Sequence, residues 1–420
     1  MRHFFFTRRF LPLFITQFFG AFSDNAFKNA IAILITYVFA SNDSGRAEIL
    51  VTISSGLFIL PYFLFSSLAG ELADKYNKAK LAVIYKIIEV VLMLFGTVGF
   101  IMHNSWFLLL LLFAMGAQST FFGPIKYSIL PQQLERSELM AGNAYVEGST
   151  FVAVLVGTIT GGVVILLDDG ILLVGIILTL SAVVGTISSY FISSAEGQSP
   201  DIKVKKNIFS ESYKLVRLVM QNRKMRLYLL LISWFWLVGS VFLAQTVIWV
   251  RHVLFADQTV VTMCMALFSV GIGAGSVFCS KLSRGEPNFR YVYRAAFAMA
   301  GLIAALVVSS GVVSPAAELY SVKTFLAHWH YLPIPFFLFA VAFCGGVYTV
   351  PLYTLMQREA TSGVVSRTVA VNNILNSFFM VASVVLVVLI YTLGFTVSHV
   401  FALLAIATAF VASMAYRGSK

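Results

Sequence analysis

Two residues of opposite charge interrupt the first long apolar segment of the chain. Asp24 and Lys28 lie near the middle of residues 10–40, which are otherwise almost wholly hydrophobic and long enough to cross a bilayer. A charge at the centre of a membrane costs at least about 2.5–3.5 kcal/mol, so such residues usually face a bundle interior or a water-filled cavity. Residues four apart also share one face of a helix. The pair therefore predicts a polar functional site among membrane-spanning helices.

A second pair of opposite charges follows in two later apolar segments. Lys126 lies deep in the fourth segment and Glu147 about two turns into the fifth. In antiparallel neighbours joined by a short loop, both side chains are expected at similar depth. With Asp24 and Lys28 they give the near-neutral balance that a low-dielectric site requires. Two internal salt bridges are the alternative, but buried pairs add little net stability, so we favour a site that binds a charged ligand.

Other residues that could do chemistry give no such indication. Lys86 and Glu89 are expected near the inner membrane interface, where long charged side chains reach toward water, and we assign them no role. Cys264, Cys279 and Cys344 lie in apolar segments without metal-site spacing, so we expect free thiols, no metal and no cofactor. No nucleophile elbow, phosphate-binding loop or HExxH motif is present, and the chain is not expected to be an enzyme.

The composition indicates the elements that must position these residues. The 420 residues are 59% hydrophobic and only 11% charged, against roughly 25% charged in soluble domains. The apolar segments are too long and continuous for the strands of a barrel. An all-α integral membrane protein with twelve transmembrane helices is predicted, at 10–40, 49–70, 81–102, 105–130, 139–167, 170–193, 226–254, 259–283, 291–313, 331–357, 368–392 and 394–416.

The net charge of +11 is explained by topology rather than by nucleic acid. Most of the 29 Lys and Arg residues fall in loops on the same side as Met1, which places both termini in the cytoplasm. Residues 194–225 form the longest inner loop. The basic residues from Arg217 to Arg226 could contact anionic headgroups, although a loop that sets topology is the preferred interpretation.

A weak internal repeat divides the chain into two pseudo-symmetric six-helix halves. The stretch Gly123 to Leu130 resembles Val350 to Gln357 around a shared proline, and each is followed at nearly the same distance by an asparagine, Asn143 and Asn372. Such repeats are common in secondary transporters. The predicted domains are a first half at 1–193, a cytoplasmic linker at 194–225 and a second half at 226–420.

The loop after the second apolar segment carries the most specific motif. Gly70 to Lys78 resembles the G-x-L-A-D-[RK]-x-G-[RK] loop of the major facilitator superfamily. Gly70 permits close helix contact, and Asp74 can cap a helix N-terminus or pair with a cation of the other half. With Lys75 and Lys78 they are predicted to form a conformational latch that favours the outward-open state.

Longer motifs resemble those of the bacterial lysophospholipid transporters, a family within this superfamily. Gln17 to Ala26 is similar to their Q-F-x-x-A-F-x-D-N-A, and Gly123 to Leu130 to their S-P-A-K-Y-G-I-L. Asn143 to Thr150 is similar to N-x-x-x-E-x-[SG]-T, and Val350 to Glu359 to V-P-L-N-A-L-L-Q-E. The resemblance covers nearly the full length. One departure is Leu243, which stands where the family has an arginine.

The resemblance implies a flippase of the Gram-negative inner membrane that works by alternating access. It implies that lysophospholipids, chiefly lysophosphatidylethanolamine, move from the outer to the inner leaflet, where a cytoplasmic acyltransferase reacylates them. Lysophospholipid and membrane lipids are thus the expected partners, and a monomer is expected, as is usual for this architecture.

The residues of the expected headgroup site combine both signs of charge. Asp24 and Glu147 would attract an ammonium group, while Lys126 and Lys28 would hold the phosphate. Polar side chains are expected to complete the hydrogen bonding: Asn25, Tyr127, Asn143, Gln245, Gln357 and Asn372.

Two other functions are compatible with the sequence. A proton-coupled carrier of a polar solute, such as a siderophore or drug, would use Asp24 and Glu147 as proton relays. A non-transporting membrane subunit or receptor is the third interpretation, and the latch motif argues against it.

Overall fold

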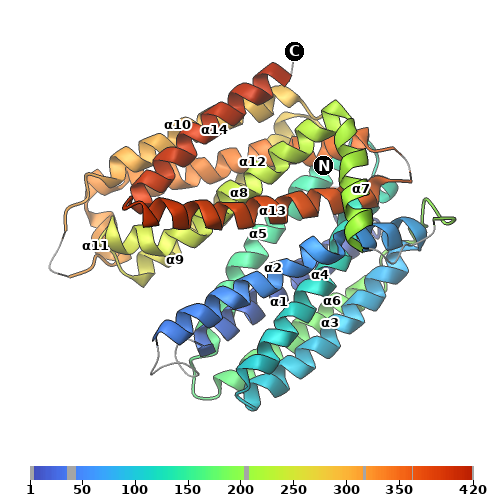
Figure 1. The fold of residues 1–420 in the computed structure, drawn as a ribbon, viewed down its shortest axis with the longest axis horizontal. Helices are drawn as coiled ribbons and strands as arrows, with labels where there is room; N and C mark the ends of the chain where they lie inside the picture. Colours follow the sequence, from blue (N-terminus) through green and yellow to red (C-terminus); the bar gives the residue numbers. More distant parts are fainter. Residues whose placement is uncertain (1–3, 36–43, 203–207, 316–317, 362, 419–420) are drawn as a thin grey trace. The chain divides into compact units, whose positions relative to one another are not determined.

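The computed structural model describes residues 4–35, 44–202, 208–315, 318–361 and 363–418 (Figure 1). Within these ranges the chain is helical, apart from one isolated bridge between Ala256 and Tyr320. The helices are α1 (Leu11–Leu34), α2 (Ser44–Lys75), α3 (Lys78–Ile101), α4 (Ser105–Gln133), α5 (Leu139–Val164), α6 (Gly170–Ser189), α7 (Ile208–Gln221), α8 (Arg223–His252), α9 (Gln258–Leu282), α10 (Phe289–Ser310), α11 (Val322–Ala327), the 3-10 turn η2 (Trp329–Tyr331), α12 (Pro333–Glu359), α13 (Val365–Thr392) and α14 (Val397–Gly418).

Eleven helical stretches among the described residues are long and apolar enough to cross a membrane. They match eleven of the predicted segments. The remaining segment is α1, which is long enough at 24 residues but less apolar, because it carries Gln17, Asp24, Asn25, Lys28 and other polar side chains. The all-α prediction is confirmed. The C-terminal end of the first predicted segment, residues 36–40, lies outside the described residues.

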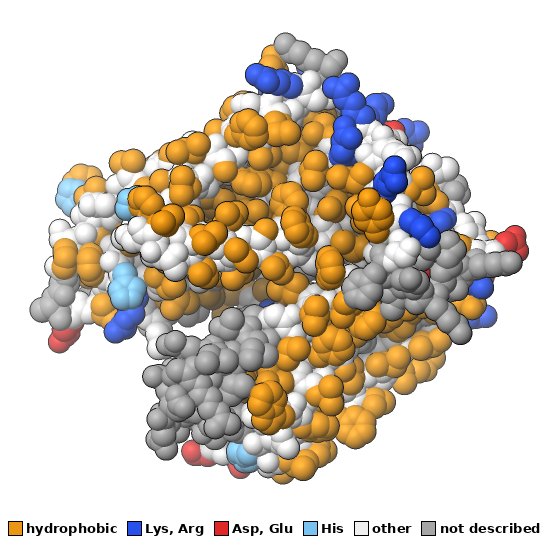
Figure 2. Space-filling view, viewed as in Figure 1, with side chains coloured by type: hydrophobic (Ala, Val, Ile, Leu, Met, Phe, Trp, Pro, Cys, Tyr) orange, Lys and Arg blue, Asp and Glu red, His pale blue; other side chains and the backbone are white. Residues whose placement is uncertain are grey.

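The surface of the helices supports a membrane environment. Large apolar side chains are exposed along one face of α3, where Ile84, Ile88, Val91 and Phe95 are each at least 41% accessible. Hydrophobic side chains also dominate the face of the molecule in Figure 2. Water-soluble proteins rarely expose such continuous apolar patches, so these faces are suited to lipid.

The structure divides into two compact units, each described here by itself. The first, unit 1, contains Met1–Gly142, Val152–Arg223 and Gln357–Ser377. It includes the bundle of α1, α2, α3, α4 and α6, in which α2 packs on α4, and α6 packs on both α1 and α3 (Figure 1). Its apolar core includes Phe27 and Phe100, whose ring centroids are 5.5 Å apart.

The second, unit 2, contains Asn143–Phe151, Lys224–Met356 and Phe378–Lys420. Here α10 and α14 run side by side (Figure 1). A Cβ built on Gly275 of α9 would lie 2.0 Å from the carbonyl oxygen of Phe343 in α12, so a glycine is needed for these helices to approach so closely. Each unit takes short segments from the other half of the chain, and the division at 194–225 stays a prediction.

The predicted inner loop contains a helix that the sequence analysis did not predict. α7 (Ile208–Gln221) lies within residues 194–225 and packs against α2. Leu215 and Val219, four residues apart, can line one face of this amphipathic helix, and Leu215 is buried. The many Lys residues of the loop hid this pattern, and Lys203, Lys205 and Lys206 themselves lie outside the described residues.

Candidate functional site

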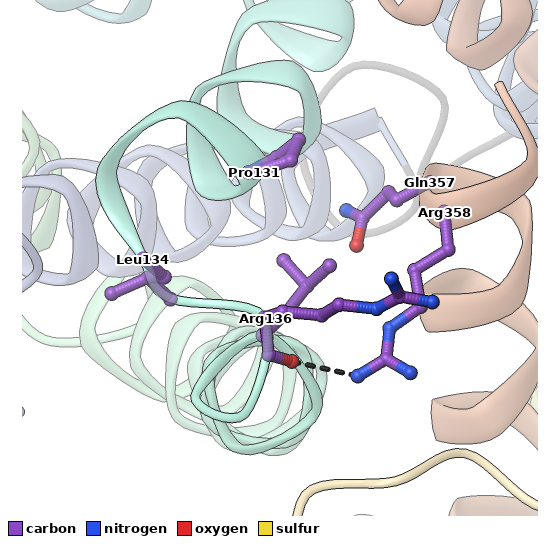
Figure 3. Close-up of a pocket in the computed structure, with 6 residues that line it drawn as sticks. Pro131, Leu134, Arg136, Gln357 and Arg358 are labelled. Atoms are coloured by element: carbon purple, nitrogen blue, oxygen red, sulfur yellow. Dashed lines mark hydrogen bonds between the residues drawn. The ribbon is translucent and has the colours of Figure 1, made fainter. Parts of the chain in front are cut away.

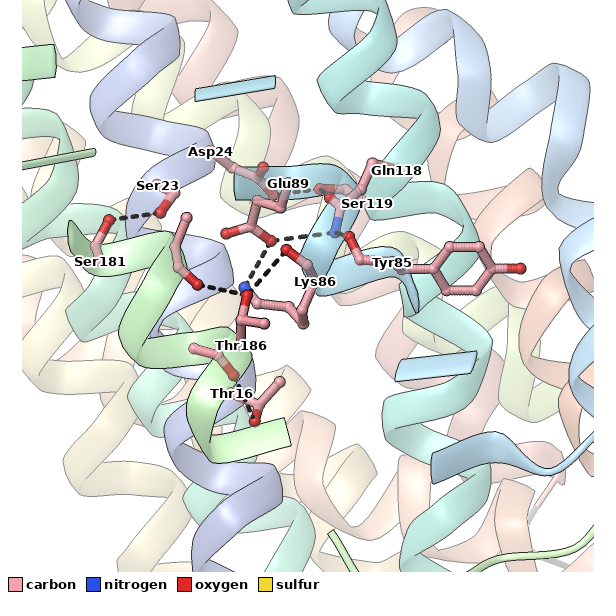
Figure 4. Close-up of polar contacts among 12 residues, drawn as sticks. Thr16, Ser23, Asp24, Tyr85, Lys86, Glu89, Gln118, Ser119, Ser181 and Thr186 are labelled. Atoms are coloured by element: carbon pink, nitrogen blue, oxygen red, sulfur yellow. Dashed lines mark hydrogen bonds and ion pairs between the residues drawn. The ribbon is translucent and has the colours of Figure 1, made fainter. Parts of the chain in front are cut away.

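Asp24 lies in a polar cluster inside unit 1 (Figure 4). The helix α1 brings its half-buried carboxylate to α4, where Oδ2 accepts a 2.6 Å hydrogen bond from Ser119 Oγ. Within the described part of the chain its other oxygen, Oδ1, is buried and accepts no hydrogen bond. A carboxylate oxygen without a donor inside a protein is costly, so it marks a position where a ligand donor would be favoured.

Lys28 lies one turn further along α1 and has different neighbours. Its Nζ donates to Asn25 Oδ1 at 3.2 Å and lies 5.5 Å from the centroid of the Phe58 ring. Within the described residues Lys28 forms no ion pair, although Asp24 lies within electrostatic range of it. Asn25 is itself held by a bond from its Nδ2 to the carbonyl of Ala21. Among the described residues, no carboxylate in direct contact with Lys28 would compete with a bound anion.

The structure corrects the prediction for Lys86 and Glu89. These residues do not lie at a wet interface: their side chains in α3 are 0% and 2% exposed, and Nζ is 2.6 Å from Oε2. Two charges taken out of water must be closely paired and hydrogen-bonded to be tolerated, and this pair meets both requirements. Opposite charges at a spacing of three within an apolar segment were a signal in the sequence, but their depth was misjudged.

A chain of hydrogen bonds connects this buried pair to Asp24 (Figure 4). Gln118 Nε2 donates to Glu89 Oε2 at 3.1 Å and also to the backbone carbonyl of Tyr85. Ser119 Oγ lies 3.3 Å from Gln118 Oε1 and donates to Asp24. Sequence analysis missed Gln118 and Ser119, whose only signal was two adjacent polar residues in an apolar segment. Together these contacts fix the orientation of the Asp24 carboxylate.

The other predicted residues of unit 1 come from α4, α12 and α13. Lys126 is half-buried, with Nζ 4.8 Å from the centroid of the Tyr127 ring. The buried side chain of Gln357 donates from Nε2 to the backbone carbonyl of Tyr127 at 3.0 Å. Asn372 is fully buried in α13. The structure thus brings Gln357 to Tyr127, as a binding region built from both halves of the sequence would require.

Three predicted residues belong to unit 2. Asn143 Nδ2 donates to Thr354 Oγ1 at 3.2 Å, and Glu147 is fully buried. Gln245, also buried, accepts a hydrogen bond from the Tyr391 hydroxyl through Oε1. Because Glu147 and the lysine in α4 belong to different units, their expected position at similar depth stays a prediction.

The predicted latch residue Asp74 is completely buried at the end of α2. Its Oδ1 accepts from the backbone N–H of Ser366, and its Oδ2 accepts from the N–H and the Nε of Arg367, at distances of 3.1, 3.3 and 3.0 Å. Asp74 therefore both caps the N-terminus of α13 and pairs with a cation from the second half of the sequence. A Cβ on Gly70 would lie 2.7 Å from the Cβ of Ala370, so only glycine permits this approach.

The beginning of the linker lies across this contact. Ser199 donates from its backbone N–H to the carbonyl of Asp74 at 2.8 Å and from Oγ to the carbonyl of Gly363 at 2.7 Å. Ser199 thus connects the end of α2 directly to the turn before α13. We call residues 194–199 the strap. The strap was not predicted, because its contacts are mostly with backbone groups far away in the sequence.

The strap also holds the other residues of the motif. Lys78 donates through its backbone N–H to Ala195 at 2.7 Å and through Nζ to the carbonyl of Glu196 at 3.3 Å. Hydrogen bonds from Ser194 and Asn77 lower the pKa of the exposed Glu196 carboxyl from its ordinary value. Lys75 instead lies 5.6 Å from the centroid of the neighbouring Tyr76 ring.

In the described ranges, no group of three or more His, Cys, Asp or Glu side chains could hold a metal ion, and Cys264, Cys279 and Cys344 are free thiols. What the cluster around Asp24 offers is a set of fixed charges and hydrogen-bonding groups between membrane helices. Such an arrangement can bind a charged or zwitterionic molecule within the membrane.

A bundle of membrane helices with buried charges, in which an aspartate at the end of one helix caps another, is typical of a membrane transporter, not an enzyme. The chain belongs to the Major Facilitator Superfamily, whose sequence profile matches residues 13–384. It is a multi-pass membrane protein of that fold.

Among similar proteins is the Lysophospholipid transporter LplT of Salmonella typhi, which is 26% identical over 368 residues, or 87% of this chain and 83% of the relative. The transporter of the same name from Salmonella paratyphi B matches to the same extent. The recognised resemblance to lysophospholipid transporters is thus confirmed.

Solved structures with low sequence identity share the fold. The human organic anion transporter MFSD10 (TETRAN) aligns with a TM-score of 0.74 at 11% identity, over 96% of this chain and 99% of that protein. A bacterial homologue of the iron transporter ferroportin in an outward-facing state aligns with a TM-score of 0.68 at 12% identity, over 97% and 98%.

Proposed function

We propose that the protein is a lysophospholipid flippase of the bacterial inner membrane. In this proposal it moves lysophospholipids, chiefly lysophosphatidylethanolamine, from the outer to the inner leaflet, where a cytoplasmic acyltransferase reacylates them. The similarity to Salmonella lysophospholipid transporters supports the substrate class. The observation that carries the proposal is the placement of Asp24 and Lys28 on one turn of α1, half-buried and bonded to neutral partners rather than to each other.

A zwitterionic headgroup complements this arrangement. Its ammonium group would donate to the buried Asp24 Oδ1, which accepts no other hydrogen bond in the described part of the chain. Its phosphate would bind Lys28 and Lys126, the two half-buried lysines of the predicted site. Charge-assisted hydrogen bonds of this kind are about twice as strong as neutral ones. Glu147 is the second acid of the proposal, as the sequence predicts.

The test is transport of labelled lysophosphatidylethanolamine by the purified protein in proteoliposomes. We expect Asp24→Asn and Lys28→Met to reduce transport by about tenfold or more, since hydrogen bonds to charged groups contribute about 1.5–3 kcal/mol. Matched controls are Asp169→Asn and Lys281→Met, which make the same chemical changes at exposed positions. Unchanged transport in Asp24→Asn and Lys28→Met would refute the site.

The headgroup assignment can be tested separately. Lysophosphatidylglycerol has the phosphate but lacks the ammonium group, so Asp24 should contribute nothing to its binding. We therefore expect Asp24→Asn to reduce transport of lysophosphatidylethanolamine much more than that of lysophosphatidylglycerol, and Lys28→Met to reduce both. Equal losses for the two lipids in Asp24→Asn would contradict the role of this carboxylate.

The hydrogen-bonded chain from Asp24 to Glu89 favours a second candidate function, a proton-coupled carrier of a polar solute. Acidic side chains within a membrane often serve as proton relays, and Asp24 and Glu89 are two such groups in one polar cluster. Transport that collapses when the proton gradient is dissipated would support this function. Lysolipid transport that continues unchanged would exclude it.

Alternating access requires a contact that closes and opens, and we propose the Asp74 junction for this role. Its bonds to Ser366 and Arg367 fasten the N-terminus of α13 to α2. The strap adds the bridge through Ser199. In this proposal the protein functions as a monomer, with its N- and C-termini and the junction on the cytoplasmic side, so that the closed latch favours the outward-open state.

A further inference from the structure

A cavity of about 250 Å³ lies in unit 1 beside the turn between α4 and α5 (Figure 3). One water molecule takes roughly 30 Å³ in the liquid, so the cavity has room for a phosphate group with its substituent. Its lining comes from the end of α4, the turn, the start of α5 and the last turn of α12: Pro131, Leu134, Arg136, Leu139, Gln357 and Arg358.

Two arginines give the cavity its charge. Arg136 extends from the exposed turn and Arg358 from the C-terminal end of α12, and both line the same space (Figure 3). Arg358 Nη2 donates to the backbone carbonyl of Arg136 at 2.7 Å, which fixes the position of its guanidinium group. No carboxylate is among the residues that line the cavity. An anion in the cavity would be attracted by both guanidinium groups.

Two acids close to these arginines in sequence have other partners. Glu138 is held by Arg9 in a two-pronged contact, with both nitrogen–oxygen distances at 3.2 Å. Glu359 accepts a long hydrogen bond from Asn222 at 3.5 Å. Neither of these acids lines the cavity.

The remaining walls strengthen the attraction. Pro131, Leu134 and Leu139 present apolar surface, which lowers the local dielectric constant and increases the interaction between charges. Gln357, near the end of α12, is held in place by its hydrogen bond to the backbone carbonyl of Tyr127 in α4. The walls are thus already formed around a space lined by two arginines.

We propose that this cavity binds a phosphate group, held by the guanidinium forks of Arg136 and Arg358. Planar guanidinium groups match the geometry of phosphate oxygens, and basic pockets between transmembrane helices on the cytoplasmic side bind anionic lipid headgroups. The phosphate belongs to an anionic lipid or to a soluble phosphate compound, which share this chemistry. The site is separate from the proposed headgroup site at Asp24. A bound phosphate would fasten the end of α12 to the turn between α4 and α5.

The test uses the purified full-length protein in a neutral detergent. Its thermal stability is measured by titration with inorganic phosphate, with phosphatidylglycerol, and with diacylglycerol as a lipid without phosphate. The variants are Arg136→Gln and Arg358→Gln. Arg290→Gln serves as a matched control, because it removes the same charge from an exposed position outside the cavity. Arg358→Lys keeps the positive charge but loses the planar guanidinium group, which can donate two parallel hydrogen bonds to phosphate.

We expect phosphatidylglycerol to stabilise the protein in a salt-sensitive way, and either cavity variant to weaken this binding about tenfold or more. Arg290→Gln should bind phosphatidylglycerol as tightly as the unmodified protein. The affinity of Arg358→Lys should lie between that of the unmodified protein and that of Arg358→Gln. If inorganic phosphate also stabilises the protein, a soluble phosphate compound is sufficient as the ligand. If only phosphatidylglycerol stabilises it, the ligand is a lipid headgroup. The proposal is overturned if neither phosphate compound stabilises the protein, if diacylglycerol acts equally, or if the cavity variants match Arg290→Gln. Size-exclusion profiles and unliganded melting show that each variant is folded.

Discussion

Replacing Asp74 by alanine should release the N-terminus of α13 from α2. The carboxylate accepts three hydrogen bonds while fully buried, from the backbone of Ser366 and from the backbone and side chain of Arg367. Loss of a helix cap costs about 0.5–2 kcal/mol, and a hydrogen bond to a charged group about 1.5–3 kcal/mol. Because Arg367 is 20% exposed and can partly rehydrate, we expect a loss of about 3 kcal/mol rather than the full sum.

The assay is hydrogen–deuterium exchange of the first turn of α13 in the purified protein. A loss of about 3 kcal/mol corresponds to exchange faster by roughly a hundredfold at the amides of Ser366 and Arg367, since each 1.4 kcal/mol is a factor of ten. Asp74→Asn keeps one oxygen acceptor but loses the charge, so its exchange should lie between that of the unmodified protein and that of Asp74→Ala. Unchanged exchange in Asp74→Ala would refute the latch.

A steric substitution tests the same contact without removing a polar group. Gly70→Ala places a Cβ 2.7 Å from the Cβ of Ala370 and 3.0 Å from the Cα of Arg367. Overpacking costs about 1–3 kcal/mol, so exchange in α13 should rise by roughly thirtyfold for a loss of 2 kcal/mol. Gly56→Ala is the matched control on the same helix, because its added Cβ meets nothing within 4 Å. Equal effects of the two alanines would show that the clash is not the cause.

Three further results are expected. Glu89→Ala leaves the ammonium of Lys86 buried without its carboxylate and should destabilise the protein by about 3–5 kcal/mol. The double variant Glu89→Gln with Lys86→Met removes both charges and should destabilise it less. Equal shifts of the two variants in thermal unfolding would contradict a direct pair. Since the folded-state pKa of Glu196 lies below its ordinary 4.5, its stabilisation of the strap is present above that pH and lost as the pH falls through the lowered pKa. Protease cleavage at the strap should therefore rise on acidification, but stay independent of pH in Glu196→Gln. If Lys28 supplies the cation that the related family carries at the position of Leu243, Lys28→Leu should reduce lysolipid transport about tenfold or more and added Leu243→Arg should restore it. A double variant that stays impaired would show that Lys28 does not replace that arginine.

The helical elements were predictable because the membrane imposes them. Every backbone polar group must be satisfied inside the bilayer, so an apolar stretch of about twenty residues has few options besides a helix. Hydropathy therefore located the spans. It could not locate α7, which packs on α2 and whose apolar residues are masked by the charges of the linker.

The latch was partly predictable from its motif. Asp74 was expected to cap a helix or pair with a cation, and it does both. The identity of its partners was not predictable, because Arg367 is 293 residues away in the chain and its approach depends on how the helices pack. The strap depends on backbone carbonyls such as that of Gly363, which leave no side-chain signature in the sequence.

The two pairs of opposite charge in unit 1 show what spacing alone could not decide. Lys86 and Glu89 are at most 2% exposed and lie in direct contact, so no water or ligand reaches them in this arrangement of the helices. Asp24 and Lys28 are half-buried and engage Ser119 and a neighbouring asparagine instead. A spacing of three or four permits an ion pair in both cases, but a hydroxyl from another helix competes for the carboxylate in only one of them. Asp24 and Lys28 are therefore more accessible to a ligand than the buried pair, and it is this pair that transport should depend on.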